Sequence, residues 1–217
     1  MRIDKSQAMV VLVGAFNTQI LRDPRWIKQY LFPDSSQDAI ELKMNLEMPA
    51  EKITSVVEID GIKVEVSSGR LAITPKDVFQ EDIDSIYGVI KNISKNLPHT
   101  PMVAYGINFG FIEKCTKPFL WKKSNFANFL MSEDSTKETL ELKQMLQYDG
   151  YMVNYSISEK KISVREFEEQ LRFNFHTPLN TNAKQALNDL LNNKKIENYM
   201  NIAQEHIKHV FSVVVEA

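Results

Sequence analysis

Two histidines near the end of the chain have a spacing that could serve chemistry. His206 and His209 are three residues apart in a segment of helical periodicity, so both project from a similar helix face and could ligate one metal ion. Two ligands do not complete a tetrahedral site, and Glu205 precedes the first histidine instead of following it as a zinc-protease motif requires. We therefore expect no metal and no cofactor, and we expect both side chains on a solvated helix face.

The tripeptide His-Thr-Pro occurs twice, at 99–101 and at 176–178. Phosphoesterases with two catalytic histidines have one residue between His and Thr or Ser, so that both side chains lie on one strand face. In this chain His and Thr are adjacent, and adjacent side chains point to opposite faces of a strand. We interpret both tripeptides as the ends of extended segments, because proline interrupts strand pairing.

Residues 114–126 interleave lysines with aromatic residues, a composition typical of a loop that binds single-stranded nucleic acid or a partner protein. The alternative is a linker whose aromatic side chains are buried and whose lysines keep the surface polar. Cys115 lies in this segment with no histidine nearby in sequence to activate it, so we expect a buried or inert thiol. The candidate contact residues are Lys114, Lys117, Trp121, Lys122 and Lys123 in this segment and Arg172, Asn174 and His176 on a later strand.

No other pattern points to catalysis. Glu166, Glu168 and Glu169 fall in a predicted strand or turn, where nothing in the sequence makes them converge. The chain has no Gly-rich phosphate loop, nucleophile elbow or kinase signature. We expect no catalytic residue, and a site assembled from distant residues stays open as an alternative.

The charge balance narrows the classes of partner. The 217 residues include 26 Lys and Arg against 28 Asp and Glu, which gives a formal net charge of -2. Dedicated nucleic-acid and membrane-surface binders normally carry a basic excess. There is one Cys, and the apolar run near the start covers only Ala8–Val13, so no disulfide, export signal or membrane span is predicted. We expect a folded cytoplasmic protein without a membrane partner.

The first half reads in the order strand, helix, four strands, helix. Asp23-Pro24 predicts the start of a short helix that Pro33 ends, because Asp caps a helix and Pro fits its first turn. Asp60-Gly61 predicts a two-residue hairpin turn. The predicted strands cover 8–17, 39–48, 53–59, 62–66 and 71–74, and the closing helix covers 77–96.

The second half is predicted to repeat this order. Its last segment, 182–211, carries apolar stripes at helical spacing and has a predicted break at Asn192-Asn193. The predicted strands cover 102–112, 139–147, 152–158, 161–167 and 170–177, and a short helix is predicted within 118–131.

An internal duplication explains the repeated order. Residues 26–43 align with residues 126–143 without a gap and with five identities. We therefore predict an α+β protein made of two pseudo-symmetric β-α-β4-α repeats, residues 1–98 and 99–217. The antiparallel sheet or sheets should have one face covered by helices, in one compact body.

This tandem resembles the repeat of the TATA-box-binding protein fold, at the level of topology and over most of the chain. The strands at 9–17 and 102–108 and the helices that begin near 77 and 182 carry the resemblance. It implies a saddle whose sheet face binds nucleic acid; in that family the face is apolar and basic, with Phe wedges that kink the minor groove. This chain departs from that pattern, because its polar strand positions are mixed and have no positive excess: Glu58, Lys63, Glu65, Arg70, Asn108, Asn154, Ser156, Arg172, Asn174 and His176.

The leading functional hypothesis is a non-catalytic protein-binding or scaffolding module that binds another protein or itself. An amphipathic terminal helix and the apolar tail Val213–Val215 favour it, since either could pack onto a partner. One alternative is a nucleic-acid-binding saddle that uses the loop 114–126. A second alternative is an enzyme with a site between the repeats.

Overall fold

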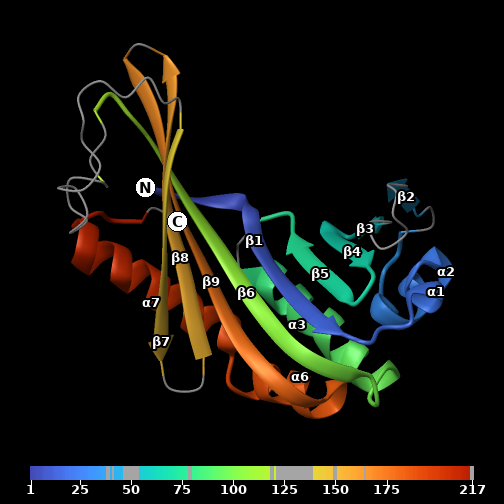
Figure 1. Cartoon of the computed structure of the whole chain (residues 1–217). Helices are drawn as coiled ribbons and strands as arrows, with labels where there is room; N and C mark the ends of the chain where they lie inside the picture. The colour runs from blue at the N-terminus through green and yellow to red at the C-terminus, as the bar shows by residue number, and fades with distance from the viewer. Residues whose placement is uncertain are drawn as a thin grey trace. The chain divides into compact units, whose positions relative to one another are not determined.

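The computed structural model describes residues 1–37, 40, 42–45, 54–77, 80–117, 120, 139–148, 151–163 and 165–215. The fold is α+β, as predicted, with one large antiparallel sheet and helices (Figure 1). The strands are β1 (Arg2–Gly14), β2 (Leu42–Asn45), β3 (Thr54–Ile59), β4 (Ile62–Ser67), β5 (Arg70–Pro75), β6 (Pro101–Cys115), β7 (Thr139–Tyr148), β8 (Tyr151–Ser163) and β9 (Glu166–Asn182). The helices are α1 (Thr18–Leu21), α2 (Pro24–Leu31), α3 (Gln80–Asn96), α6 (Ala183–Asn192), α7 (Lys195–His206) and the π-helical turn η2 (Ile207–Phe211).

The strand order in the sheet is β2-β3-β4-β5-β1-β6-β9-β8-β7. The chain divides into two compact units. The β2–β5 unit comprises residues 8–107 and 176–196, and the β7–β8 unit comprises residues 1–7, 108–175 and 197–217. The duplication, with its boundary between residues 98 and 99, stays a prediction.

In the β2–β5 unit, buried and more exposed positions alternate along β3 and β4 and set the register of these strands. The turn Asp60-Gly61 has φ angles of 49° and 78°, the left-handed pair that a tight hairpin between twisted strands needs. This confirms the predicted hairpin turn. Cross-strand pairing then aligns one inward-facing row over five strands: Leu42, Val57, Val64, Ile73 and Val10.

Helices cover the inward face of this unit. The Asp23 side chain accepts a hydrogen bond from the backbone N of Arg25 at 2.9 Å, so α2 begins at Pro24 as predicted. Along α3 the apolar side chains recur at helical spacing, and α3 packs against β4, β5, α2 and α6. Amide side chains of α3 also cap α2, because Asn92 and Asn96 donate to the carbonyls of Leu31 and Tyr30, each at 3.0 Å. The buried residues of α3 are Ile83, Ile86, Val89, Ile90, Ser94 and Ile93.

In the β7–β8 unit, an aromatic cluster fills the space between the sheet and α7. The rings of Phe175 on β9 and Tyr199 on α7 stack with centroids 4.5 Å apart and planes inclined by 10°. Phe173 meets Phe111 of β6 edge to face at 5.8 Å and stacks on Tyr155 of β8 at 6.0 Å. Edge-to-face and offset-stacked pairs are the arrangements that aromatic quadrupoles favour.

The second half departs from the predicted strands. Residues 152–158, 161–167 and 170–177 were each predicted as a strand, but the structure has only β8 and β9 there. Three strands, β7 to β9, therefore lie between residues 139 and 182, and no fourth is found in the part of this half that the structure describes. The reason is that Glu159, Lys160 and Lys161 include no turn-forming residue, so β8 continues through them, with Lys160 and Lys161 exposed to solvent and Glu159 half-buried.

Three other boundaries differ from or agree with the predictions. The first strand begins at Arg2 and ends at Gly14, instead of covering 8–17. The strand β9 continues past Thr177-Pro178 to Asn182, so this tripeptide does not end a strand. The predicted break in the terminal helix is confirmed, because α6 ends at Asn192 and Lys194 has a left-handed φ of 44°. The predicted helix within 118–131 lies outside the described residues, apart from Leu120.

None of the described helices combines the length and the apolar character needed to cross a lipid bilayer.

Candidate functional site

Two of the predicted contact residues on β9, Arg172 and Asn174, lie on the polar face of the β7–β8 unit. Arg172 and Asn174 alternate with the buried side chains of Leu171, Phe173 and Phe175. The guanidinium of Arg172 donates to Oε1 of Gln170 at 2.7 Å, and Nε2 of Gln170 donates to Oε1 of Glu168 at 3.0 Å. Hydrogen bonds therefore connect the guanidinium of Arg172, through the side-chain amide of Gln170, to the carboxylate of Glu168 on the same strand.

Asn174 is the centre of a ladder of asparagines that crosses three strands. Its Nδ2 donates to Oδ1 of Asn108 on β6, and Nδ2 of Asn154 on β8 donates to Oδ1 of Asn174 at 3.4 Å. The amide of Asn174 thus serves the sheet itself. His176, two residues further along β9, is half-buried.

The lysine and aromatic segment is described only at its start. Lys114 at the end of β6 and Lys117 just after it are both exposed to solvent. Trp121, Lys122 and Lys123 lie outside the described residues. The proposed contact surface of this segment therefore stays a prediction, and the two described lysines at the start of the segment are exposed.

The surroundings of Cys115 disfavour its thiolate form. Its Sγ lies 3.6 Å from Oε2 of Glu169, to which the thiol donates a weak hydrogen bond. Burial, and then the negative charge of Glu169, raise the pKa of the Cys115 thiol to about 11. The thiolate is the reactive form, so these surroundings favour the unreactive thiol, and the inertness of Cys115 stays a prediction.

Glu169 is the residue that sequence reasoning missed. Its side chain is completely buried, and its Oε1 accepts a hydrogen bond from the backbone N of Leu120 at 2.9 Å. Burial, and then the charge of Glu169, raise the pKa of Glu159 on β8. Two of the chain's acids, Glu159 and Glu169, therefore lie near each other beside Cys115. Sequence reasoning considered Glu169 only together with Glu166 and Glu168 and did not identify this pair. The hydrogen bond gives Glu169 a structural role, since it holds the backbone of Leu120, which follows the end of β6 at Cys115.

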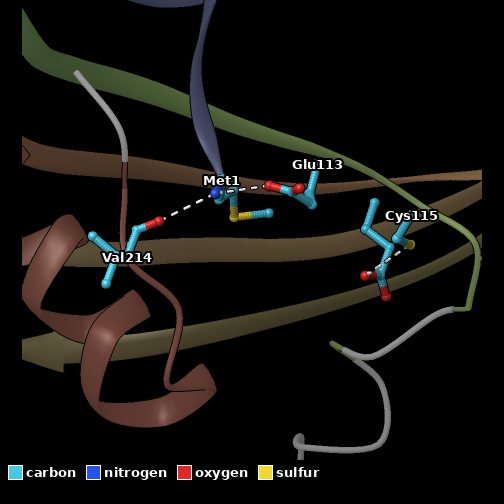
Figure 2. Close-up of polar contacts among 5 residues, drawn as sticks. Met1, Glu113, Cys115 and Val214 are labelled. Carbon is cyan, nitrogen blue, oxygen red and sulfur yellow. Dashed lines mark hydrogen bonds and ion pairs between the residues drawn. The ribbon is translucent and has the colours of Figure 1, made fainter.

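The amino group of Met1 lies close to this cluster and joins two parts of the β7–β8 unit (Figure 2). It donates to Oε2 of Glu113 on β6 at 2.7 Å and to the carbonyl of Val214 in the C-terminal tail at 3.1 Å. The tail is thus tied through its backbone, while the side chain of Val214 is 74% exposed.

The two histidines of the last helix do not share a solvated face. His206 is half-buried between rings of β8, β9 and η2, and burial lowers its pKa. His209 is exposed and pairs with Glu205 at 3.1 Å. The π-helical turn that starts after His206 adds residues to the turn, so the helix no longer aligns positions three apart. No group of three or more potential metal-binding side chains occurs in the described parts of the chain.

A hollow of about 920 Å³ lies on the outer face of β2, β3 and β4, opposite the helices. We call it the outer hollow. Apolar side chains from Ile40 and Val56 stand beside charged groups of both signs. Its lining comprises Gln37, Ile40, Lys43, Val56, Glu58, Asp60, Gly61 and Lys63.

Strand register places these groups. Val57 and Val64 face the core, so Val56 and the charged neighbours on β3 and β4 must face outward. Lys43 stands directly opposite Val56, and Glu58 stands directly opposite Lys63. Opposite charges at facing positions are favourable in an antiparallel pair.

Two hydrogen bonds fix one wall of the outer hollow. Nζ of Lys28 on α2 donates to the carbonyl of Gln37, and the backbone N of Asp60 donates to Oε1 of Gln37 at 3.2 Å. Gln37 thereby connects α2 to the hairpin between β3 and β4. Ile40 also borders a second hollow of about 510 Å³, which we call the α2 hollow; its lining comprises Pro24, Arg25, Lys28, Gln29, Pro33 and Ile40.

Sequence reasoning identified Glu58 and Lys63 as polar-face residues but did not identify Gln37, Lys43 or Asp60 as their neighbours. The alternation of Leu42, Lys43 and Met44 was a usable signal, because it places Lys43 on the face opposite Leu42. Gln37 has no such signal, since it lies in a loop.

The chain matches no known protein-family model and no curated protein sequence.

Proposed function

We propose that this chain is a non-catalytic protein-binding module and that its outer hollow receives an extended segment of a partner protein. The lining of the outer hollow is the observation that supports this proposal. Two ammonium groups, from Lys43 and Lys63, stand with the carboxylates of Glu58 and Asp60 around aliphatic side chains. An extended protein segment offers side chains of either sign, apolar groups and backbone amides, which is the mixture that such a lining complements.

The same lining argues against a nucleic-acid partner at this site. Binding to a phosphate backbone draws its affinity from an excess of Lys and Arg, because each contact releases counterions. Among the described residues that line the outer hollow, the carboxylates of Glu58 and Asp60 balance the ammonium groups of Lys43 and Lys63. The polar face of the β7–β8 unit is similar, since Arg172 is linked through Gln170 to Glu168.

The α2 hollow adds a preference for the sign of the charge on the partner segment. Among the described residues of its lining, the charged side chains are those of Arg25 and Lys28, and both are basic. Because Ile40 borders both hollows, a segment that passes over Ile40 from the outer hollow would meet this positive charge. We therefore expect the partner segment to carry acidic side chains at the end that approaches α2.

A site-specific photo-crosslinker placed at Val56 tests the proposal in living cells. Val11 is the matched control, because it lies on β1 in the same outward-facing row but outside the lining of the outer hollow. We expect Val56, and not Val11, to crosslink reproducibly to one protein sequence, which mass spectrometry of the crosslinked peptide identifies. Equal crosslinking from both positions would contradict the proposal.

A charge swap separates recognition from folding. The double variant Glu58→Lys with Lys63→Glu keeps opposite charges at facing positions. It also breaks the ion pair of Lys63 with Glu65 at 3.4 Å, but exposed pairs contribute little to stability, so circular dichroism should be unchanged while the crosslink from Val56 is lost. If the crosslinked peptide belongs to this chain, sedimentation over a concentration series should show self-association.

Titration with single- and double-stranded DNA and RNA at two salt concentrations tests the nucleic-acid alternative, because true phosphate contacts weaken as salt rises.

A further inference from the structure

The imidazole of His206 is enclosed by aromatic rings at the end of α7. Its centroid lies 5.3 Å from the ring of Tyr155 on β8 and 5.7 Å from the ring of Phe173 on β9. The ring of Phe211 in η2 lies 6.3 Å away. Nε2 of His206 is buried and has no hydrogen-bond partner among the residues that the structure describes. The surroundings of this ring therefore suit a neutral imidazole.

We infer that His206 is an acid-sensitive latch: its neutral ring holds the end of α7 against β8 and β9, and its protonation releases α7, η2 and the tail after them. This goes beyond the proposed binding function, because the latch lies in the β7–β8 unit and the outer hollow lies in the β2–β5 unit.

Among the described residues, the groups that face His206 do not supply a counter-charge. From β8 it meets the phenol of Tyr155, whose hydroxyl donates to Oε1 of Gln144 at 2.5 Å. From β9 and η2 it meets the rings of Phe173 and Phe211, which do not titrate. On its own helix the neighbouring carboxylate, Glu205, is paired with the exposed His209.

Burial sets the direction of the pH dependence. It lowers the pKa of His206 in the folded chain relative to the unfolded chain, where the imidazole is solvated. The stabilisation by the neutral ring is thus complete above the unfolded pKa and is lost as the pH falls through the folded pKa. Each unit between these two pKa values changes the folding equilibrium tenfold at acidic pH.

The position of His206 explains why release would reach the tail. The π-helical turn begins at the next residue, and Phe211 at its end is completely buried. Ser212 then takes a left-handed conformation with φ of 54°, and the carbonyl of Val214 accepts the hydrogen bond from the Met1 amine. A charged His206 therefore disturbs the packing that leads directly into this last contact.

Hydrogen exchange and histidine NMR together test the latch. The full chain is compared with His206→Phe, which keeps a ring of similar shape without a titrating group, and with His99→Gln, which removes an exposed imidazole elsewhere. Amide protection of α7, η2 and the tail is measured from about pH 7.5 to about pH 5 and corrected for intrinsic exchange. We expect wild type and His99→Gln to lose protection as the pH falls, by a further tenfold for each unit between the two pKa values, and His206→Phe to keep it.

The titration of histidine ring carbons in the wild-type chain provides a test that needs no variant. We expect His206 to titrate at lower pH in the folded chain than in the chain unfolded by urea, and the loss of protection to level off as the pH falls through the folded transition. Titration of His206 at the same pH in the folded and unfolded chains would overturn the inference. So would equal loss of protection in wild type and His206→Phe. If His206→Phe does not fold, the two titrations of the wild-type chain decide the question.

Discussion

The closest backbone approach at a glycine gives a sharp prediction for stability. A Cβ atom built on Gly14, at the end of β1, would lie 2.4 Å from the carbonyl oxygen of Pro101. That oxygen cannot retreat easily, because it accepts a hydrogen bond from the backbone N of Ala15 at 2.9 Å. A Cβ on Gly88, on the exposed side of α3, would meet nothing within 4 Å. Neither glycine has a positive φ, so Ala is tested for space alone at both positions.

The two substitutions should have opposite signs. An ordinary contact needs roughly 1 Å more than Gly14 has, and overpacking of this kind costs about 1–3 kcal/mol. Ala restricts the unfolded chain and returns about 0.4–1 kcal/mol, which leaves Gly14→Ala destabilised by about 1–2 kcal/mol. Gly88→Ala should gain about 0.5–1 kcal/mol, because Ala is the better helix former. Their difference is about 2 kcal/mol, or ~4–8 °C in Tm for a chain of this size.

Urea unfolding followed by far-ultraviolet circular dichroism measures both variants. Both glycines lie in the β2–β5 unit, so each reports on the same body. We expect the midpoint to fall for Gly14→Ala and to rise for Gly88→Ala, with the denaturant slope unchanged. A midpoint for Gly14→Ala at or above that of wild type would refute the reasoning, since it would mean that β1 moves away from Pro101 at no cost.

Three further outcomes follow from buried polar groups. Ser55→Ala should stabilise the chain by about 1 kcal/mol, because Oγ of Ser55 is buried without a hydrogen-bond partner in the described part of the structure; chemical denaturation measures it, and a loss of stability would contradict it. Cys115 should react far more slowly with a disulfide reagent at mildly alkaline pH than the denatured chain does, and Glu169→Gln should speed the reaction by lowering the thiol pKa; a native rate equal to the denatured one would show an accessible thiolate. Glu113→Gln should cost about 1 kcal/mol in unfolding free energy, since the Met1 amine loses its charged partner, and acetylation of that amine should make the substitution nearly neutral.

Local signals predicted much of the β2–β5 unit. The cap Asp23, the hairpin turn at Asp60-Gly61 and the alternation of Ile62, Val64 and Val66 each concern residues a few positions apart, and each appears in the structure. Such features depend on the backbone conformation of a few residues or on which face of a strand is buried, and residue types and spacing in the sequence indicate both. The outer hollow was not predicted, because Gln37 reaches the hairpin through contacts with Lys28 and Asp60 that no local pattern encodes.

The prediction that His206 lies on a solvated helix face was wrong for a different reason. Helical spacing placed it beside His209, and a regular helix would have kept both on one side. The π-helical turn changes this alignment, and the rings of Tyr155 and Phe173 come from strands more than thirty positions away in sequence. The enclosure of a polar ring therefore depends on long-range packing, which periodicity within one helix cannot reveal.

Glu169 shows how a small error in a strand boundary changes the chemistry inferred for a residue. With a strand predicted to begin at residue 170, Glu169 belongs to a turn and its carboxylate is expected in solvent. The structure begins β9 at Glu166, and the side-chain alternation that buries Leu171, Phe173 and Phe175 then places Glu169 on the same inward face. This buried carboxylate gives Leu120 its hydrogen-bond acceptor, and its charge adds to the effect of burial in raising the pKa of the Cys115 thiol. The reactivity of a thiol on β6 therefore depends on where a distant strand begins, because parity along that strand decides whether a charge lies inside or outside.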